Sequence, residues 1–333
     1  MREVFAAQFR DRVVHHLIYN YIAPLLIPGF IRDSYSCIPG RGTHDGIFRL
    51  EKNICRESRN YSSPCYVLKL DIQGYFMHID RRKLLNICLQ SLEPFRARMD
   101  YPLVKYLLEV IVLEDPTLNC RRRGFESDWD GLPDSKTLFC SPPGCGLPIG
   151  NLTSQLFSNV YMDLFDKYMV SLVGDGNYGR YVDDAYVVGT SKEQLRSLIP
   201  LADSFLRNEL GLTLSRHKVA VYSAYQGVEF LGAYLKPYRI YISNRCLKRM
   251  EEKIDILSLW LAEFSDSRHS LGNLKQISLS VNSFLGITSH YRAYNIRLRW
   301  ARGPLRPLFR FGYFTGGILT FRPENHHDSP FFL

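Results

Sequence analysis

Two adjacent carboxylates interrupt an apolar, strand-like stretch of the sequence, RYVDDAYVVGT, in which Asp183 and Asp184 follow Tyr181 and Val182. Burying an unpaired carboxylate is costly, so acids in such a place are usually held by a partner charge, and a divalent metal ion is the strongest candidate. The same pattern also fits a hairpin whose tip carries two aspartates as ordinary turn residues. The four residues alone leave metal binding and turn chemistry equally open.

A third carboxylate, Asp71, lies near the end of the strand-like segment YVLKLDI at residues 66–72. An acid that closes one strand and an acid pair at a hairpin tip can meet on neighbouring strands of one sheet. Paired carboxylates can hold two divalent ions roughly 3.5 to 4 Å apart, which contact the attacking and leaving oxygens in phosphoryl transfer. Because oxygen ligands suit magnesium, the three acids are candidates for a magnesium site that could serve phosphoryl transfer.

Hydrophobic spacing predicts the elements that position these acids. Helices are predicted over residues 4–26, 81–90, 152–173 and 192–210, with a strand over 66–72, a hairpin over 178–189 and short strands within 218–242. Residues 119–146 are rich in Arg, Gly, Pro and Asp, which indicates an irregular segment. Strands mixed with helices without regular alternation predict an α+β fold.

The last third of the chain carries most of the positive charge. Residues 236–310 contain fourteen Lys or Arg and five Asp or Glu, which accounts for the whole net charge of +9. Apolar residues at steps of three and four predict an amphipathic helix over 247–264, and a second helix is predicted over 270–294. Arginines interleaved with aromatic residues are typical of nucleic-acid contacts, for which the candidates are Arg292, Arg297, Arg299 and Arg302. A solvated basic helix face is the alternative interpretation.

Composition excludes several other classes of protein. A chain of 333 residues with 46% hydrophobic content can bury a large core, which excludes a disordered protein. The sequence contains no apolar run long enough for a membrane span, and its charged N-terminus does not look like a secretory signal. Its eight cysteines form no C-x-x-C pair, which argues against a structural zinc site of the usual spacing. We therefore expect a cytoplasmic protein without a membrane anchor.

Six ordered blocks of the sequence resemble the motifs of reverse transcriptases. DIQGYF, which begins at Asp71, is similar to motif A, GLPIGNLTSQ at 146–155 to motif B, and YVDD at 181–184 to motif C. GLTLSRHKVAV at 211–221 is similar to motif D, GVEFLGAYL at 227–235 to motif E, and FIRDSYSCIPGRGTHDG at 30–46 to the fingers block that precedes motif A. A single YVDD is a weak signal, whereas six blocks in the family order are a strong one.

The resemblance implies a right-hand polymerase fold with fingers, a palm built on an antiparallel sheet, and a helical thumb. It assigns residues 1–65 to the fingers, 66–80 and 146–236 to the palm, 81–145 to a fingers or palm insertion, 237–310 to a basic thumb and 311–333 to a C-terminal tail. The family usually has more fingers sequence before the segment similar to REVFAAQFRDRVVHH. A truncated N-terminus with impaired activity is therefore one expectation.

The resemblance also implies catalytic and metal-binding residues. Asp71, Asp183 and Asp184 are expected to be the catalytic carboxylates. Together with Ile72, they are expected to bind two Mg²⁺ ions, for which Mn²⁺ can substitute. Lys218 matches the motif D lysine that is proposed to protonate the pyrophosphate, with an ordinary surface lysine as the alternative.

Further residues are implied in substrate binding. Phe76 matches the aromatic gate that excludes a 2′-hydroxyl, and a core aromatic is the alternative. Arg41, in a glycine-flanked loop, is a candidate for contact with the dNTP phosphates or the templating base, with a surface arginine in a flexible loop as the alternative. Ile149, Gly150 and Gln155 of motif B are expected to contact the nucleotide or the template.

Motif B departs from the common pattern of Gln-Gly at its start and Ser-Pro at its end. Ile149-Gly150 and Ser154-Gln155, with DWDGLPDSKTLF at 128–139, resemble reverse transcriptases of diversity-generating retroelements. That family copies a template-repeat RNA into cDNA with errors at adenines, and works with a small, basic, oligomeric accessory variability protein. The implied partners are therefore template RNA, a DNA or RNA primer, dNTPs and this accessory protein. The alternatives are a retron or group II-like reverse transcriptase, or a catalytically impaired RNA-binding protein of polymerase fold.

Overall fold

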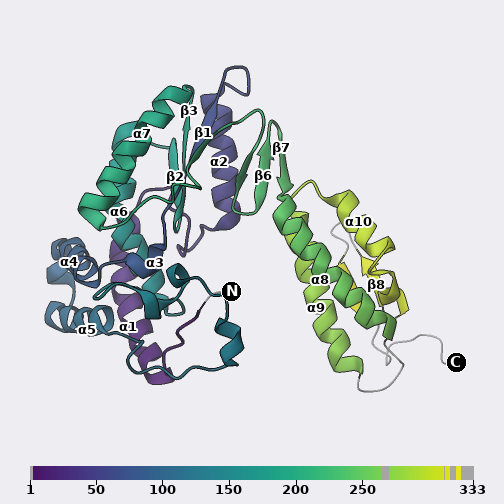
Figure 1. Cartoon of the computed structure of the whole chain (residues 1–333), viewed down its shortest axis with the longest axis horizontal. Helices are drawn as coiled ribbons and strands as arrows, with labels where there is room; N and C mark the ends of the chain where they lie inside the picture. Colours follow the sequence, from purple (N-terminus) through teal and green to yellow (C-terminus); the bar gives the residue numbers. More distant parts are fainter. Residues whose placement is uncertain (1–2, 264–269, 311, 316–319, 324–333) are drawn as a thin grey trace. The chain divides into compact units, whose positions relative to one another are not determined.

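The computed structural model describes residues 3–263, 270–310, 312–315 and 320–323 (Figure 1). The chain divides into two compact units, Met1–Ala224 and Tyr225–Leu333. The short strands between residues 228 and 242 belong to the second unit. No helix in the described ranges is both long and apolar enough to span a membrane.

An antiparallel sheet with the strand order β2-β3-β1-β4 forms the centre of the first unit. Its strands are β1 (Tyr66–Asp71), β2 (Tyr178–Tyr181), β3 (Asp184–Gly189) and β4 (Ala220–Ser223). Val67, Leu68 and Leu70 of β1 are buried, as expected for a strand that is covered on both faces. The register pairs Tyr66 with Gly189 at one end of β1 and Asp71 with Asp184 at the other.

Helices cover this sheet and build the rest of the unit. They are α1 (Phe9–Leu26), α2 (Thr43–Glu57), α3 (Tyr75–His78), α4 (Arg81–Leu92), α5 (Tyr101–Leu113), α6 (Leu152–Val173) and α7 (Lys192–Phe205). Asp80, Asp100 and Ser191 cap α4, α5 and α7 by accepting a backbone N–H with their side chains, which fixes where these helices begin. In the view of Figure 1, α6 and α7 lie to the left of the strands and α2 to their right.

The longest helix, α6, connects the sheet to the other helices. Phe157 and Tyr161 of α6 are buried in the same apolar cluster as Leu68 and Leu70 of β1. The α1, α4 and α6 helices pack on one another, and the Tyr161 hydroxyl donates to the Leu210 carbonyl at 2.5 Å. The Leu147 N–H donates to the Phe76 carbonyl at 2.8 Å, which holds the segment that leads into α6, residues 146–151, beside α3.

The predicted strand at 66–72, the hairpin at 178–189 and the short strands within 218–242 are confirmed, and the predicted helix at 152–173 has the bounds of α6. The irregular segment at 119–146 contains only short 3₁₀ helices, at Glu126–Trp129, Asp134–Lys136 and Leu138–Cys140. The first helix begins at Phe9 instead of residue 4. The preceding residues are held elsewhere, since the Phe5 N–H donates to the Ile149 carbonyl at 2.7 Å.

The second unit combines a small antiparallel sheet with helices. Its elements are β5 (Val228–Phe230), β6 (Ala233–Lys236), β7 (Arg239–Ile242), α8 (Asn244–Glu263), α9 (Ser270–Ser289), α10 (Tyr294–Arg302) and the hairpin of β8 (Gly312–Thr315) and β9 (Thr320–Pro323). Ile254, Val281, Leu285 and Trp300 belong to its apolar core.

The second helix predicted for this unit, over 270–294, ends earlier than expected, and a separate helix begins where the prediction ended. The α9 helix ends at Ser289, and α10 begins at Tyr294. The Thr288 hydroxyl bonds the carbonyls of Phe284 and Leu285, at 3.0 and 2.9 Å, which competes with helix continuation. The Arg297 Nη1 donates to the Thr288 carbonyl at 2.9 Å, which supplies this carbonyl with a donor where the chain turns.

Candidate active site

The three acids lie at the same end of the sheet. Asp71 ends β1, Asp184 begins β3, and the two are direct partners in the antiparallel register. Asp183 lies in the turn between β2 and β3, where its backbone carbonyl accepts the Ile72 N–H at 3.3 Å. Residues separated by more than a hundred positions are thereby brought together by the pairing of two strands.

Two lysines neutralise part of this negative charge. The Lys218 Nζ lies 2.9 and 3.0 Å from the two carboxylate oxygens of Asp71. The Lys69 Nζ lies 3.3 and 3.4 Å from the two carboxylate oxygens of Asp184. Lys69 is two residues before Asp71 on β1, so both side chains emerge on the same face of the strand. Sequence reasoning did not identify Lys69 as part of the site. The signal that could have identified it is a single lysine in an otherwise apolar strand.

Asp184 has an unusual proton affinity. Burial is the main cause that raises the pKa of the Asp184 carboxyl, to about 6. The negative charges of Asp183 and Asp71 also raise this pKa, and the positive charge of Lys69 lowers it. A bound cation stabilises the ionised form of a carboxylate most strongly where burial and neighbouring negative charges disfavour that form. The site therefore favours an additional positive charge beside Asp184.

The donor set fits a hard divalent cation in its chemical type. Asp71 and Asp183 offer carboxylate oxygens, and Ile72 offers a backbone carbonyl oxygen, which are the ligands that such ions prefer. In the described part of the chain, no three side chains of His, Cys, Asp or Glu are gathered into a metal-binding group. Lys218 and Lys69 supply the countercharge to Asp71 and Asp184 instead. A cation at Asp71 would take over the role of the Lys218 ammonium.

Motif B lies against the N-terminal residues. Besides the bond from the Phe5 N–H to the Ile149 carbonyl, a Cβ on Gly150 would lie 2.6 Å from the Phe5 carbonyl oxygen. Gly150 has a φ of +129°, so both its conformation and its surroundings require glycine. Gln155 is exposed in the first turn of α6, and Ile149 is half-buried. Sequence reasoning did not anticipate the contact with Phe5.

Glu3 anchors this N-terminal segment to the irregular region. Its carboxylate accepts hydrogen bonds from the Leu138 N–H at 2.9 Å, the Trp129 Nε1–H at 3.1 Å and the Thr137 hydroxyl at 3.2 Å. The rings of Phe5 and Phe139 are 5.9 Å apart. These contacts keep residues 3–5 beside motif B.

Phe76 and Arg41, the two candidate substrate contacts outside motif B, have different surroundings. Phe76 lies in α3, five residues after Asp71; it is half-buried, with its ring 5.1 Å from that of Tyr75. The Arg41 Nη1 donates to the carbonyls of Ile31 and Ser34, at 2.7 and 3.0 Å, and burial lowers the pKa of its guanidinium. One guanidinium nitrogen of Arg41 is therefore used to hold its own loop.

The four candidate arginines of the second unit differ in what they contact. Arg292 and Arg302 are exposed, and Arg299 pairs with Glu251. Arg297 is only 6% exposed and donates to the Thr288 carbonyl. The prediction of a nucleic-acid contact is therefore wrong for Arg297, because its guanidinium is used inside the unit to hold the turn between α9 and α10.

Comparison with known proteins agrees with this geometry. Residues 1–235 match the family described as reverse transcriptase (RNA-dependent DNA polymerase). The chain belongs to this family, whose domains are nucleotidyltransferases and generally use divalent metal ions. No curated protein matches the sequence.

Solved structures of telomerase share the fold. Apo telomerase from Candida tropicalis has a TM-score of 0.53 and 12% sequence identity, covering 90% of this chain and 49% of that chain. Candida tropicalis telomerase in complex with a TWJ fragment of telomeric RNA has a TM-score of 0.50 and 10% identity, covering 89% of this chain and 46% of that chain. The chain spans about half the length of these proteins. The likeness confirms the predicted α+β fold of the right-hand type.

Proposed function

We propose that this chain is an RNA-directed DNA polymerase that extends a DNA or RNA primer with dNTPs on an RNA template. The observation that carries the proposal is the register pairing of Asp71 with Asp184, with Asp183 in the adjacent turn, in a member of the reverse transcriptase family. A cytoplasmic location is part of the proposal, in keeping with access to RNA and dNTPs.

The proposed chemistry is nucleotidyl transfer at the three acids. Two Mg²⁺ ions, when bound, would supply an activated primer 3′-hydroxyl and neutralise the pyrophosphate, and Mn²⁺ can substitute for them. Asp71, Asp183 and the Ile72 carbonyl are the proposed ligands, with Asp184 beside them. The Lys218 ammonium can donate a proton to the leaving pyrophosphate. Phe76 excludes a 2′-hydroxyl in this proposal.

Primer extension tests the polymerase activity. An oligo-dT primer on poly-rA, with dTTP and Mg²⁺, should be extended by the wild type and by Asp175→Ala but not by Asp183→Ala. Asp175 is an exposed aspartate in the loop before β2, which makes it a matched control. Absence of synthesis by the wild type would reject the enzyme, and synthesis by Asp183→Ala equal to that of the wild type would reject the site.

We further propose that the polymerase is of the diversity-generating retroelement type. The support is the sequence of motif B, in which Ile149 stands where most of the family has an amide. Loss of an amide near the nucleotide removes a polar check on base-pair geometry, which would permit errors at template adenines. A small basic accessory variability protein is the partner that this proposal implies.

Sequencing the products of copying a mixed-sequence RNA tests this subtype. The wild type should misincorporate at adenines more than at other template bases, and Ile149→Gln should reduce those errors. Equal error rates at all four bases would reject the subtype. Unchanged adenine errors in Ile149→Gln would reject the explanation through Ile149.

A catalytically impaired RNA-binding protein is the second candidate function. It is favoured by the 2.7 Å hydrogen bond from the Phe5 N–H to the Ile149 carbonyl, which places residues 3–5 beside motif B. Phe5→Pro removes this donor. If residues 3–5 impair nucleotide binding, Phe5→Pro should raise the rate of primer extension, whereas Phe5→Ala, which keeps the N–H, should raise it less.

A further inference from the structure

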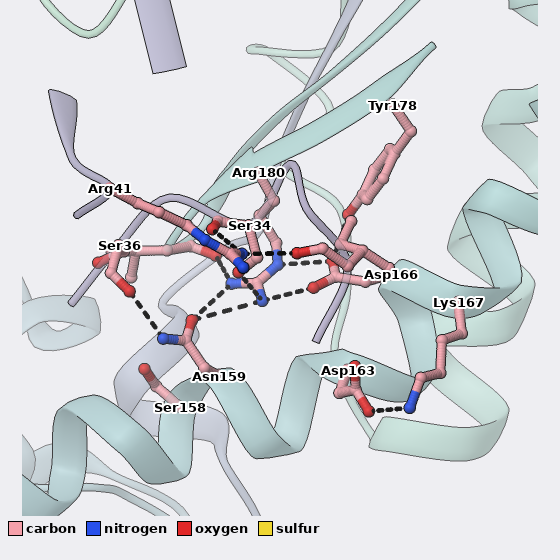
Figure 2. Close-up of polar contacts among 12 residues, drawn as sticks. Ser34, Ser36, Arg41, Ser158, Asn159, Asp163, Asp166, Lys167, Tyr178 and Arg180 are labelled. Carbon is pink, nitrogen blue, oxygen red and sulfur yellow. Dashed lines mark hydrogen bonds and ion pairs between the residues drawn. The ribbon is translucent and has the colours of Figure 1, made fainter. Parts of the chain in front are cut away.

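A buried ion pair lies beneath the YVDD turn. Arg180 and Asp166 are each only 1% exposed, and two parallel hydrogen bonds of 2.7 Å join the Arg180 Nε and Nη2 to the two Asp166 oxygens (Figure 2). The Tyr178 hydroxyl donates to the same carboxylate at 2.7 Å. A buried ion pair adds little net stability compared with apolar residues of the same volume, although removal of one partner is costly. A gain in stability is therefore a weak explanation for the presence of the buried pair of Arg180 and Asp166.

The remaining nitrogen of Arg180 reaches the catalytic turn. The Arg180 Nη1 donates to the Val182 carbonyl at 2.9 Å. Val182 has a φ of +59°, which is an unfavourable backbone conformation for a β-branched residue and persists only where neighbours enforce it. The Val182 carbonyl belongs to the peptide group that leads directly into Asp183. The guanidinium thus fixes the orientation of the peptide that precedes a proposed metal ligand.

Arg180 is itself held from the other side by the fingers block. Its N–H donates to the Asp33 carbonyl at 2.8 Å, and its carbonyl accepts the Tyr35 N–H at 3.0 Å. The Asn159 amide of α6 donates to the Ser36 carbonyl at 2.8 Å and lies beside the Arg180 guanidinium (Figure 2). Backbone and side chain of Arg180 are therefore both fixed, so the position of Nη1 is well determined.

We propose that Arg180, oriented by Asp166, is a positioning residue that sets the conformation of the YVDD turn and thereby the placement of Asp183. Its effect on catalysis rests on the proposed polymerase function, whereas its effect on the turn does not. Arg180 acts through the Val182 carbonyl and touches no substrate. Lysine cannot replace it, because a single ammonium lacks the planar fork that pairs with Asp166 while a third nitrogen reaches Val182.

Hydrogen exchange of the turn tests the proposal without reference to activity. The Ile72 N–H is a reporter, because it donates to the Asp183 carbonyl across the strands. In Arg180→Lys, exchange at Ile72 and at residues 182–184 should be about tenfold faster than in the wild type, as expected for loss of one hydrogen bond, while exchange within α6 stays unchanged. Equal exchange in the turn would overturn the proposal.

Steady-state kinetics test the consequence for catalysis. Arg180→Lys should lower kcat by about tenfold to a hundredfold, the scale of a displacement near 1 Å in a catalytic group, with the KM for dNTP changed less than about threefold. An unchanged kcat together with faster exchange would overturn the catalytic part. A wild type that fails to polymerise would reject the proposed function, and the exchange measurement would still decide the role of Arg180 in the turn.

A charge-neutral double variant separates positioning from folding. Asp166→Asn with Arg180→Gln removes both buried charges and keeps an acceptor for the Tyr178 hydroxyl. Its melting temperature should exceed that of Arg180→Gln alone, because no unpaired carboxylate remains. Its kcat should stay as low as that of Arg180→Gln, because the Val182 carbonyl has lost its donor. Recovery of kcat together with stability would show that the pair only stabilises the fold.

Discussion

The Lys218 ammonium lies 2.9 and 3.0 Å from the carboxylate oxygens of Asp71, although 147 residues separate the two in the chain. Lys218 precedes β4, which pairs with β1 on the side opposite to β3. The pairing of β1 with β4 therefore brings an acid at the end of β1 together with a basic group in the turn before β4. In the proposed reaction, a metal ion bound at Asp71 would supply the countercharge in place of Lys218, whose ammonium would then be available to the pyrophosphate.

Replacement of Lys218 tests whether its ammonium donates a proton to the pyrophosphate. Lys218→Ala should lower kcat by about a hundredfold, the usual contribution of a general acid, and change the free energy of unfolding by less than about 1 kcal/mol because the ion pair is exposed. Single-turnover incorporation kinetics and thermal unfolding measure the two effects. A variant with the wild-type rate would show that Lys218 is an ordinary surface lysine.

The raised pKa of Asp184 predicts a pH dependence of stability. Its pKa is about 6 in the folded protein and 3.8 in the reference state, so the folded state binds more protons between these values. Through this group, stability decreases as the pH rises from about 4 to 6 and stays lower above.

Asp184→Asn should remove this contribution. In the presence of a chelator, the variant should gain stability relative to the wild type between pH 4 and 6, by at most about 2 kcal/mol after solvent screening. Urea unfolding across this pH range measures the difference. A difference that does not vary with pH would contradict the raised pKa.

The basic second unit should bind nucleic acid through exposed arginines. Arg302→Ala should weaken binding of a primer–template duplex and reduce the slope of log K against log salt by about 1, without loss of thermal stability. Arg297→Ala should instead lower the melting temperature, because it leaves the buried Thr288 carbonyl without its donor. The same change of slope in both variants would contradict the structural role of Arg297.

Phe76 is expected to select the sugar. Phe76→Val should raise the use of rNTPs relative to dNTPs by about tenfold or more, since a smaller side chain leaves room for a 2′-hydroxyl. The ratio of kcat/KM for the two nucleotides measures the discrimination. If the variant loses stability without a change in this ratio, Phe76 serves only as a packed aromatic.

The sequence predicts much of the site because strand pairing follows from pattern. Asp71 at the end of an apolar strand and Asp183-Asp184 in a hairpin could meet on neighbouring strands, and the resemblance to reverse transcriptases assigned them to one site. Arg297 could also have been corrected from spacing, because Trp300 and Ala301 lie three and four positions further on and are buried on the same face.

Other contacts leave no local signal. The pair of Arg180 and Asp166 joins a strand to a helix, and each residue read alone is an ordinary charged residue. The bonds of Glu3 reach residues more than a hundred positions away, in an irregular segment without periodicity. Such contacts depend on how elements pack, which local hydrophobic patterns do not specify.

Single-nucleotide incorporation with Mg²⁺ is the most direct test that the acids at the end of β1 and β3 form a polymerase site. Wild type and Asp175→Asn should add one ddTMP, from the chain terminator ddTTP, to an oligo-dT primer on poly-rA at similar rates, while Asp71→Asn and Asp183→Asn should be slower by about a thousandfold or more. Wild-type rates in either of the last two variants, with the fold retained, would contradict the account.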